Sequence, residues 1–277
     1  FCDVNDDDLT INLNKCEDLV SKSTRTMIVI DYNMSIADHD QISDFAKEHR
    51  LNVIHDAAHS IGATYKGVSI GNQHSYTMFS FDAVKTFTAI DGGILVVTSE
   101  DEREALREMR MIGQAQAPAL LYKDKRQWRY DVKRMGFRYH MANLHEAIGM
   151  AQLKKRARIQ RSRQDLLRFY NENLSEIEEV RAPKSSFGPS NPFMYHIRVG
   201  AEVRDHFRSY LADFGVGTGI HWQPGHWFSL FDNCRQGDLK VSDRVGREIV
   251  TLPFHSMMDH DDRDHVVDVI SSYFSGR

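Results

Sequence analysis

The stretch from His55 to Gly93 holds residues whose types and spacing suit chemistry. One short apolar run ends at Asp56, and a later one leads through Ser80 to Lys85. Ligands of open α/β sheets lie beyond the carboxyl ends of the strands, so we expect Asp56 and Ser80 to meet there. A carboxylate can pair with a protonated ring nitrogen, a hydroxyl can hold a phosphate, and a lysine amine can form a Schiff base. These side chains together would suit one cofactor.

The elements that must position these residues follow from the pattern of apolar side chains. Helical spacing covers residues 36–49, and Ser99 is a favoured N-cap for a helix over residues 100–111 that starts with acidic side chains. Strands are predicted at residues 26–31, 51–54, 76–81 and 94–98. Alternation of strand and helix favours an α/β fold with a parallel or mixed sheet.

The second half of the chain has a different pattern. Residues 141–174 predict one long helix, or two that are nearly continuous, and a strand is expected at residues 193–199. Further helices are expected at residues 201–214, 241–250 and 259–273. We therefore expect two domains, residues 1–140 and residues 141–277, with the long helix connecting the first to a smaller α+β domain.

Composition excludes several classes of protein. The 277 residues include 35 Lys and Arg against 39 Asp and Glu, a net charge of −4, and 41% are hydrophobic, as in an ordinary globular protein. No apolar run approaches the ~20 residues of a membrane span, and the charge balance argues against a dedicated nucleic-acid binder. Three scattered cysteines indicate a reduced, cytoplasmic protein.

Five segments, in the same order, resemble the DegT/DnrJ/EryC1/StrS family of pyridoxal-phosphate (PLP)-dependent sugar aminotransferases. Residues 55–63 (HDAAHSIGA) resemble its EDAAQAxGA motif, and residues 79–93 resemble its FSFxxxKxxxxxEGG pattern, with Asp91 in place of Glu. The other segments, GFRYHM at 136–141 with AIGMAQL at 147–153, HWQPGH at 221–226 and LP at 252–253, are similar to its GYNYRM…AAIGLAQL, HYxPxH and late LP.

The resemblance implies a fold-type-I transferase, with a mixed, mostly parallel sheet in a large PLP-binding domain and a smaller α+β C-terminal domain. Lys85 would form the covalent link to the PLP aldehyde, and Asp56 would bond the pyridine nitrogen. His59 stands beside the ring where the family usually has Gln, and Ser80 would bind the phosphate. Arg138 stands where many members have Asn and would reach the phosphate across a homodimer interface, as a guanidinium can.

The resemblance also implies the reaction. A nucleotide-linked keto sugar would become an amino sugar, with glutamate as the expected amino donor, in cell-surface polysaccharide or secondary-metabolite biosynthesis. His221, Trp222 and His226 would form a substrate-facing loop, and no metal is expected in the site. Sister dehydratases carry His where this chain has Lys85, which favours transamination. Residue Phe1 resembles a point well inside the family's large domain, so the sequence is expected to lack an upstream segment.

Other interpretations of the same residues remain open at this stage. Asp56 is also explained as a simple helix cap, since Asp is a favoured N-cap residue. His55, Asp56 and His59 would suit a metal-dependent hydrolase if they shared one face. The basic run at residues 154–163 would suit a nucleic-acid-binding regulator, although a solvated helix face is the preferred explanation.

Overall fold

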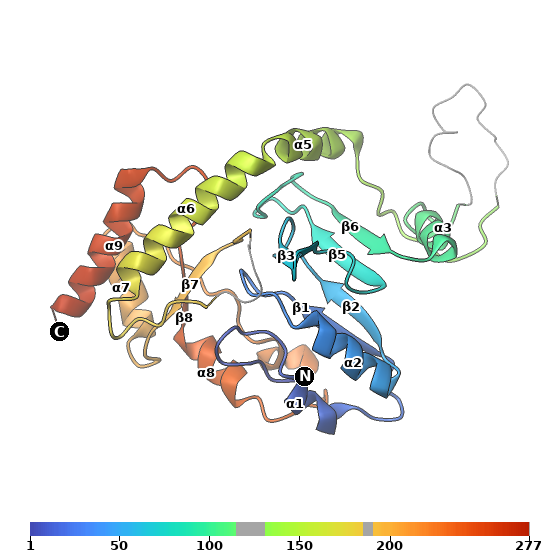
Figure 1. Cartoon of the computed structure of the whole chain (residues 1–277), viewed down its shortest axis with the longest axis horizontal. Helices are drawn as coiled ribbons and strands as arrows, with labels where there is room; N and C mark the ends of the chain where they lie inside the picture. Colours follow the sequence, from blue (N-terminus) through green and yellow to red (C-terminus); the bar gives the residue numbers. More distant parts are fainter. Residues whose placement is uncertain (115–130, 185–190, 277) are drawn as a thin grey trace.

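The computed structural model describes residues 1–114, 131–184 and 191–276 (Figure 1). Its main sheet has four strands in the order β1 (Thr26–Ile30), β2 (Asn52–Asp56), β5 (Tyr76–Ser80) and β6 (Gly93–Val97). The first three are parallel and β6 is antiparallel, which confirms the predicted mixed sheet. A short hairpin of β3 (Thr64–Tyr65) and β4 (Val68–Ser69) lies between β2 and β5 in the chain and was not expected from the sequence.

Helix α2 (His39–His49) covers one face of the sheet. Its apolar side chains pack against Val29 of β1 and Val53 of β2, which explains why these positions are buried. Asp38 caps the helix by accepting a hydrogen bond from the Gln41 N–H, and Arg50 ends it in the left-handed conformation (φ 56°). The helix begins three residues later than predicted because this cap sets its start. Helix α3 (Glu100–Met109) follows β6 directly and is capped by Ser99, as predicted.

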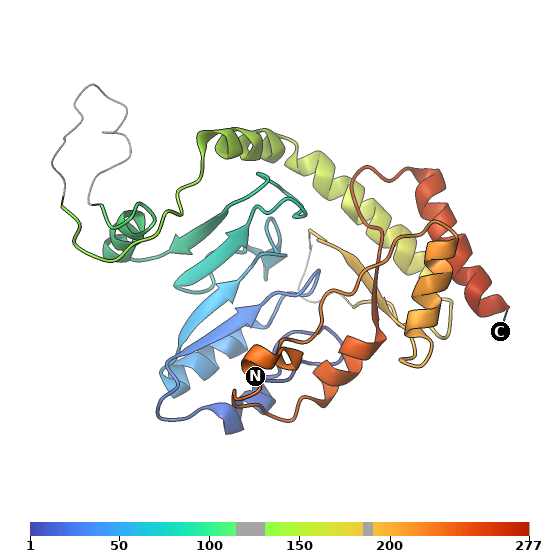
Figure 2. The ribbon, with the colours of Figure 1, turned by 180° about the vertical axis from the view of Figure 1, so that it is seen from behind.

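The second half is built on a two-stranded antiparallel sheet, β7 (Tyr195–Arg198) with β8 (Ile249–Leu252). Helices gather around it (Figures 1 and 2), and with it they enclose the largest apolar core of the described chain. They are α6 (Arg156–Leu174), α7 (Arg204–Asp213) and α9 (His260–Ser275), whereas α8 (Lys240–Glu248) leads directly into β8. The long helical segment is two helices, since α5 (Asn143–Lys154) ends at Lys154 and the cap residue Lys155 separates it from α6.

One prediction in this half was wrong. The helix expected over residues 241–250 ends at Glu248, and Ile249 begins strand β8. Val241 and Val245 continue the helical period into Ile249, so the local pattern shows no break. The four β8 residues are all buried because they pair with β7, and that long-range pairing decides their conformation.

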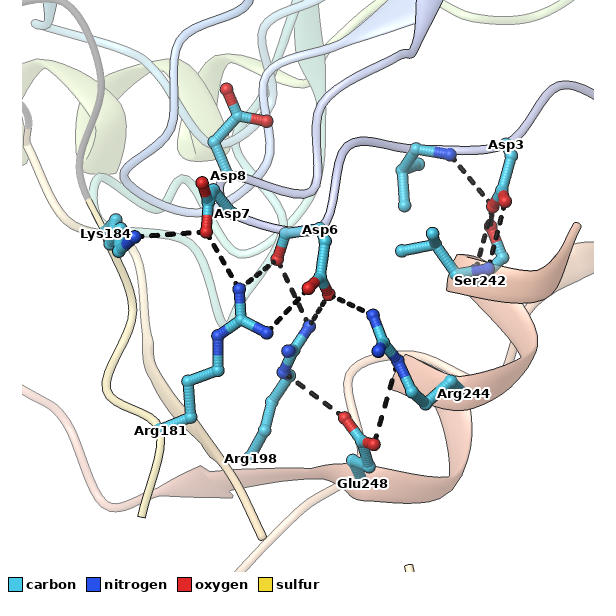
Figure 3. Close-up of polar contacts among 12 residues, drawn as sticks. Asp3, Asp6, Asp7, Asp8, Arg181, Lys184, Arg198, Ser242, Arg244 and Glu248 are labelled. Atoms are coloured by element: carbon cyan, nitrogen blue, oxygen red, sulfur yellow. Dashed lines mark hydrogen bonds and ion pairs between the residues drawn. The ribbon is translucent and has the colours of Figure 1, made fainter. Parts of the chain in front are cut away.

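An ion-pair network fastens the first residues of the chain to the second half (Figure 3). The Asp6 carboxylate accepts hydrogen bonds from Arg198 at 2.6 Å, Arg244 at 2.5 Å and Arg181 at 2.7 Å. The Asp3 carboxylate accepts from the backbone N–H groups of Val241 and Ser242, at 3.0 and 2.8 Å, in the first turn of α8. The N-terminal segment that leads to strand β1 is therefore attached to β7 and α8.

We expect Asp6→Asn to lower the free energy of unfolding by about 1–3 kcal/mol near neutral pH, because Arg198 is only 6% exposed and loses charge-assisted hydrogen bonds. Burial would raise the pKa of Asp6, but the hydrogen bonds and charges of Arg198 and Arg181 outweigh it and hold this pKa well below the usual range. The stabilisation is therefore present above the unfolded-state pKa of about 3.9 and is lost as pH falls below it. Denaturant unfolding between neutral and acidic pH measures both effects.

Asp7→Asn is the matched control. The Asp7 side chain is 66% exposed in its pairs with Arg181 and Lys184, so its replacement should change the free energy of unfolding much less than Asp6→Asn does. Equal losses in the two variants, or a gap between wild type and Asp6→Asn that persists in acid, would contradict this account.

Candidate active site

Asp56 and Ser80 lie at neighbouring positions along one edge of the sheet. They end β2 and β5, which run parallel with Asp56 opposite Met78. The Asp56 carboxylate accepts a hydrogen bond from the Ala58 N–H at 3.0 Å, inside a turn. The elements that follow Asp56 are strands and turns, and the next helix in the chain is α3, which begins at Glu100. Asp56 is therefore not the cap of an adjoining helix. The Ser80 hydroxyl accepts from the Asp82 N–H at 3.3 Å.

Lys85 lies on the loop after β5, and its side chain is half-buried between aromatic residues of the second half of the chain. The amine is 4.5 Å from the centre of the Phe193 ring and 5.9 Å from that of the Trp222 ring. Burial lowers the pKa of Lys85, although the negative charges of Asp56 and Asp82 oppose that shift. A lower pKa increases the fraction of neutral amine, which is the form that acts as a nucleophile or base.

His59 is packed between the two halves of the molecule as a neutral ring. It lies nearly parallel to Phe193 (4.4 Å between centres) and to Trp222 (5.1 Å). Its Nδ1 accepts a hydrogen bond from the Asn33 N–H at 3.2 Å, so the proton sits on Nε2. Burial lowers the pKa of His59 to about 3, and the positive charge of Lys85 adds to the effect.

Asn33 joins the end of β1 to the segment that carries Phe193. Its amide oxygen accepts from the Met194 N–H at 3.0 Å, and its amide nitrogen lies 3.1 Å from Nδ1 of His196. Asn33 is buried in the left-handed region (φ 58°), which Asn tolerates better than most residues. The buried guanidinium of Arg163 in α6 donates to the carbonyls of Phe193 (2.8 Å) and Phe254 (3.4 Å), which fixes the same segment from the other side.

The substrate-facing loop expected at residues 221–226 is only partly next to Lys85. The His221 carbonyl accepts a hydrogen bond from the Tyr32 hydroxyl, and the pKa of His221 is lowered by burial and by the charge of Lys85. His226 instead bonds Asp243 at 2.9 Å. It lines a largely apolar hollow of about 550 Å³, which Tyr32 and Trp222 also line.

Arg138 lies away from this group within its own chain. It forms an isolated antiparallel bridge with Met111 and lines a separate hollow of about 800 Å³ beside β6, together with Asp91 and His140. The structure therefore brings together Asp56, Lys85, His59 and Trp222, with Ser80 at the same sheet edge, and leaves Arg138 and His226 elsewhere.

The positions of the side chains bear on the two alternative functions, the metal-dependent hydrolase and the nucleic-acid-binding regulator. His55 points to Asp31, whereas His59 contacts Asn33 and Trp222, so His55, Asp56 and His59 do not form one ligand set. In the basic run, Arg163 is 6% exposed and bonds backbone carbonyls, so the expectation of a fully solvated face was wrong at that position. The histidines therefore do not support a hydrolase, and the nucleic-acid interpretation loses Arg163 from its set of exposed cations.

Sequence reasoning missed three residues that shape the site. Tyr32 and Asn33 follow β1 directly, so the rule that points to the carboxyl ends of strands would have found them. Phe193 carried no local signal, since it reaches Lys85 only when the second half folds against the first.

The chemistry of the donor set fits PLP. A half-buried amine, a carboxylate and a hydroxyl match the aldehyde, the ring nitrogen and the phosphate of that molecule, and they come from one edge of the sheet. Aromatic rings next to the amine provide the apolar wall that a heterocycle requires.

The architecture is that of the fold-type-I transferases, with a mixed, mostly parallel sheet and a smaller C-terminal α+β part. A family model described as the DegT/DnrJ/EryC1/StrS aminotransferase family matches residues 1–271. The chain therefore belongs to this family and is an enzyme of the aminotransferase class.

Individual relatives agree with this assignment. GDP-perosamine synthase of Caulobacter vibrioides is 29% identical over 271 residues, 95% of this chain and 70% of that protein. The sugar aminotransferase CalS13 of Micromonospora echinospora is 26% identical with a TM-score of 0.87, covering 98% of this chain and 73% of that one. Spr1654 of Streptococcus pneumoniae, solved in a PLP form, shares the fold at 20% identity and a TM-score of 0.89, covering 99% and 74%.

We expect the His59 ring to stay neutral from about pH 5 to pH 8, with its proton on Nε2, because its pKa is near 3. Nitrogen-detected NMR of the imidazole measures the tautomer and any titration. In the unfolded chain this ring protonates near pH 6.5, so His59 reduces stability as pH falls below that value. The stability of His59→Gln should therefore decline less on acidification; a ring that titrates within the neutral range would contradict the assignment.

Proposed function

We propose that this chain is a PLP-dependent aminotransferase that converts a nucleotide-linked keto sugar to the corresponding amino sugar, with glutamate as the amino donor. The placement of the Lys85 amine near Asp56 carries the proposal, because these groups would hold opposite ends of one cofactor. Family membership and the named activities of the relatives support the substrate class. In the same proposal, residues 1–140 and 141–277 are the two domains.

In this proposal, Lys85, Asp56 and Ser80 each have a distinct role. Lys85 would hold PLP covalently and, once displaced by the donor, would move a proton from the donor's α-carbon to the carbon that carried the PLP aldehyde. Asp56 would keep the ring nitrogen protonated, and Ser80 would bind the phosphate. When bound, PLP supplies an aldehyde that carries the amino group and a ring that accepts the electron pair left on the α-carbon.

The walls of the site would exclude water and orient the two substrates. Phe193 and Trp222 shield the Lys85 amine, and His59, fixed by Asn33, would lie beside the ring as a neutral donor through Nε2. His221 and Trp222 would contact the sugar, and His226 would act from the neighbouring hollow.

Among the described residues, no helix is both long enough and apolar enough to cross a membrane. We propose a cytoplasmic location.

We further propose that the enzyme is a homodimer and that Arg138 serves the partner's site. Within its own chain Arg138 is exposed and lies apart from Lys85, in a different hollow. A guanidinium in that position suits a phosphate dianion.

Lys85→Ala should abolish the visible absorption of bound PLP and all transamination, because no amine remains to hold the aldehyde. Absorption spectra after incubation with PLP and removal of the excess measure this, and circular dichroism checks the fold. Lys66→Ala is the matched control, since Lys66 is exposed and pairs with Asp40. If Lys85→Ala kept the absorption band, the covalent role of Lys85 would be refuted.

Co-expression of Lys85→Ala with Arg138→Ala tests the shared site. Each variant alone should be inactive or strongly impaired, but a mixed dimer should contain one site with both residues intact and recover about half of the activity per dimer. Activity of differently tagged, doubly purified dimers is the measurement. No recovery, with both variants dimeric and folded, would show that Arg138 acts within its own chain or not at all.

A further inference from the structure

A second group of ionisable side chains lies in the interior, separate from the proposed catalytic set. Asp31 follows β1, His39 begins α2 and His55 lies in β2, with His74 just before β5. The exposed fractions of Asp31, His39 and His55 are 0%, 2% and 0%. Burying a carboxylate among three imidazoles is costly unless positive charge compensates it.

The ligand atoms of three of these residues converge. His55 Nε2 is 2.7 Å from Asp31 Oδ2, and His39 Nε2 is 3.3 Å from Asp31 Oδ1. One ligand atom from each residue lies within 4.8 Å of the others. Tetrahedral zinc with bonds of about 2.0–2.1 Å separates its ligand atoms by about 3.4 Å, so little movement would be needed.

Several buried polar atoms in this group lack hydrogen bonds among the described residues. His39 Nε2 makes none, although it faces the Asp31 carboxylate. His55 Nδ1 and the hydroxyl of Thr77, its register partner in β5, also make none. If His55 bound a metal through Nε2, its proton would sit on Nδ1, which has no hydrogen-bond partner among the described residues.

The surroundings orient the remaining atoms as a metal site requires. His39 Nδ1 is 3.0 Å from His74 Nε2, and a hydrogen bond donated by His39 Nδ1–H to His74 would leave His39 Nε2 free of its proton. The Asp31 carboxylate also accepts from the Ser60 hydroxyl at 2.6 Å and the Ala37 N–H at 3.0 Å. Such outer contacts fix the orientation of metal-binding side chains.

We propose that Asp31, His39 and His55 bind one divalent transition-metal ion, with zinc favoured by the two imidazoles and one carboxylate. The ion would join β1, α2 and β2 in the interior and neutralise the Asp31 carboxylate. Its role is structural: His55 precedes Asp56, so the ion would stiffen the strand end that carries this carboxylate. The alternative is a proton shared between Asp31 and the imidazoles, and metal analysis separates the two.

The test uses the full chain, freed of any tag and treated with EDTA before dialysis against zinc. Mass-spectrometric metal analysis should find about one zinc ion per chain. His39→Gln should lose most of it, and His74→Ala should weaken binding about 10- to 100-fold as an orienting residue would. His255→Gln, which replaces an exposed histidine, should keep full occupancy.

Cobalt gives an independent readout, because Co²⁺ bound in a tetrahedral site absorbs visible light. The wild type should gain this absorption and a higher thermal midpoint on adding Co²⁺ or Zn²⁺, and His39→Gln should show neither. Wild-type protein that takes up no zinc and no cobalt overturns the proposal even if a variant fails to fold. Equal uptake by wild type and a folded His39→Gln overturns it as well.

Discussion

The parallel pairing of β2 with β5 is the constraint on which the proposed site depends. It brings the ends of both strands to one edge, so the Asp56 carboxylate lies opposite Met78 and the Ser80 hydroxyl follows two residues further along β5. The loop after β5 then carries the amine of Lys85 back towards Asp56. A shift of one residue in this register would turn Asp56 to the opposite face of the sheet and dismantle the donor set.

The site is nonetheless completed by the second half of the chain. Phe193 and Trp222 come from segments beyond the main sheet. Phe193 reaches Lys85 because Asn33 and Arg163 hold the segment that precedes β7, and the loop of Trp222 is held by the hydrogen bond from Tyr32 to the His221 carbonyl. The Asp6 network adds a second attachment between the halves. A half-buried amine with a lowered pKa is thus a property of two cores packed together rather than of a single loop.

Sequence reasoning recovered the parts of this arrangement that local chemistry determines. The strands at residues 26–31 and 76–81, the cap at Ser99 and the edge shared by Asp56 and Ser80 all followed from periodicity, capping and topology. Strand β8 and the contribution of Phe193 did not, because each depends on a partner distant in the chain. The burial of Arg163 could not be predicted for the same reason. The other cations of the basic run are exposed, whereas the Arg163 guanidinium donates to carbonyls of two other segments.

The position of Arg163 also bears on how such enzymes can be recombined. Because this helix α6 side chain bonds the backbone on either side of the small sheet, the helix is not an interchangeable spacer between two modules. A chimaera that joined the catalytic sheet of one family member to the C-terminal part of another would have to take α6 from the C-terminal donor. Cutting after the helix would separate the guanidinium from the carbonyls shaped to receive it.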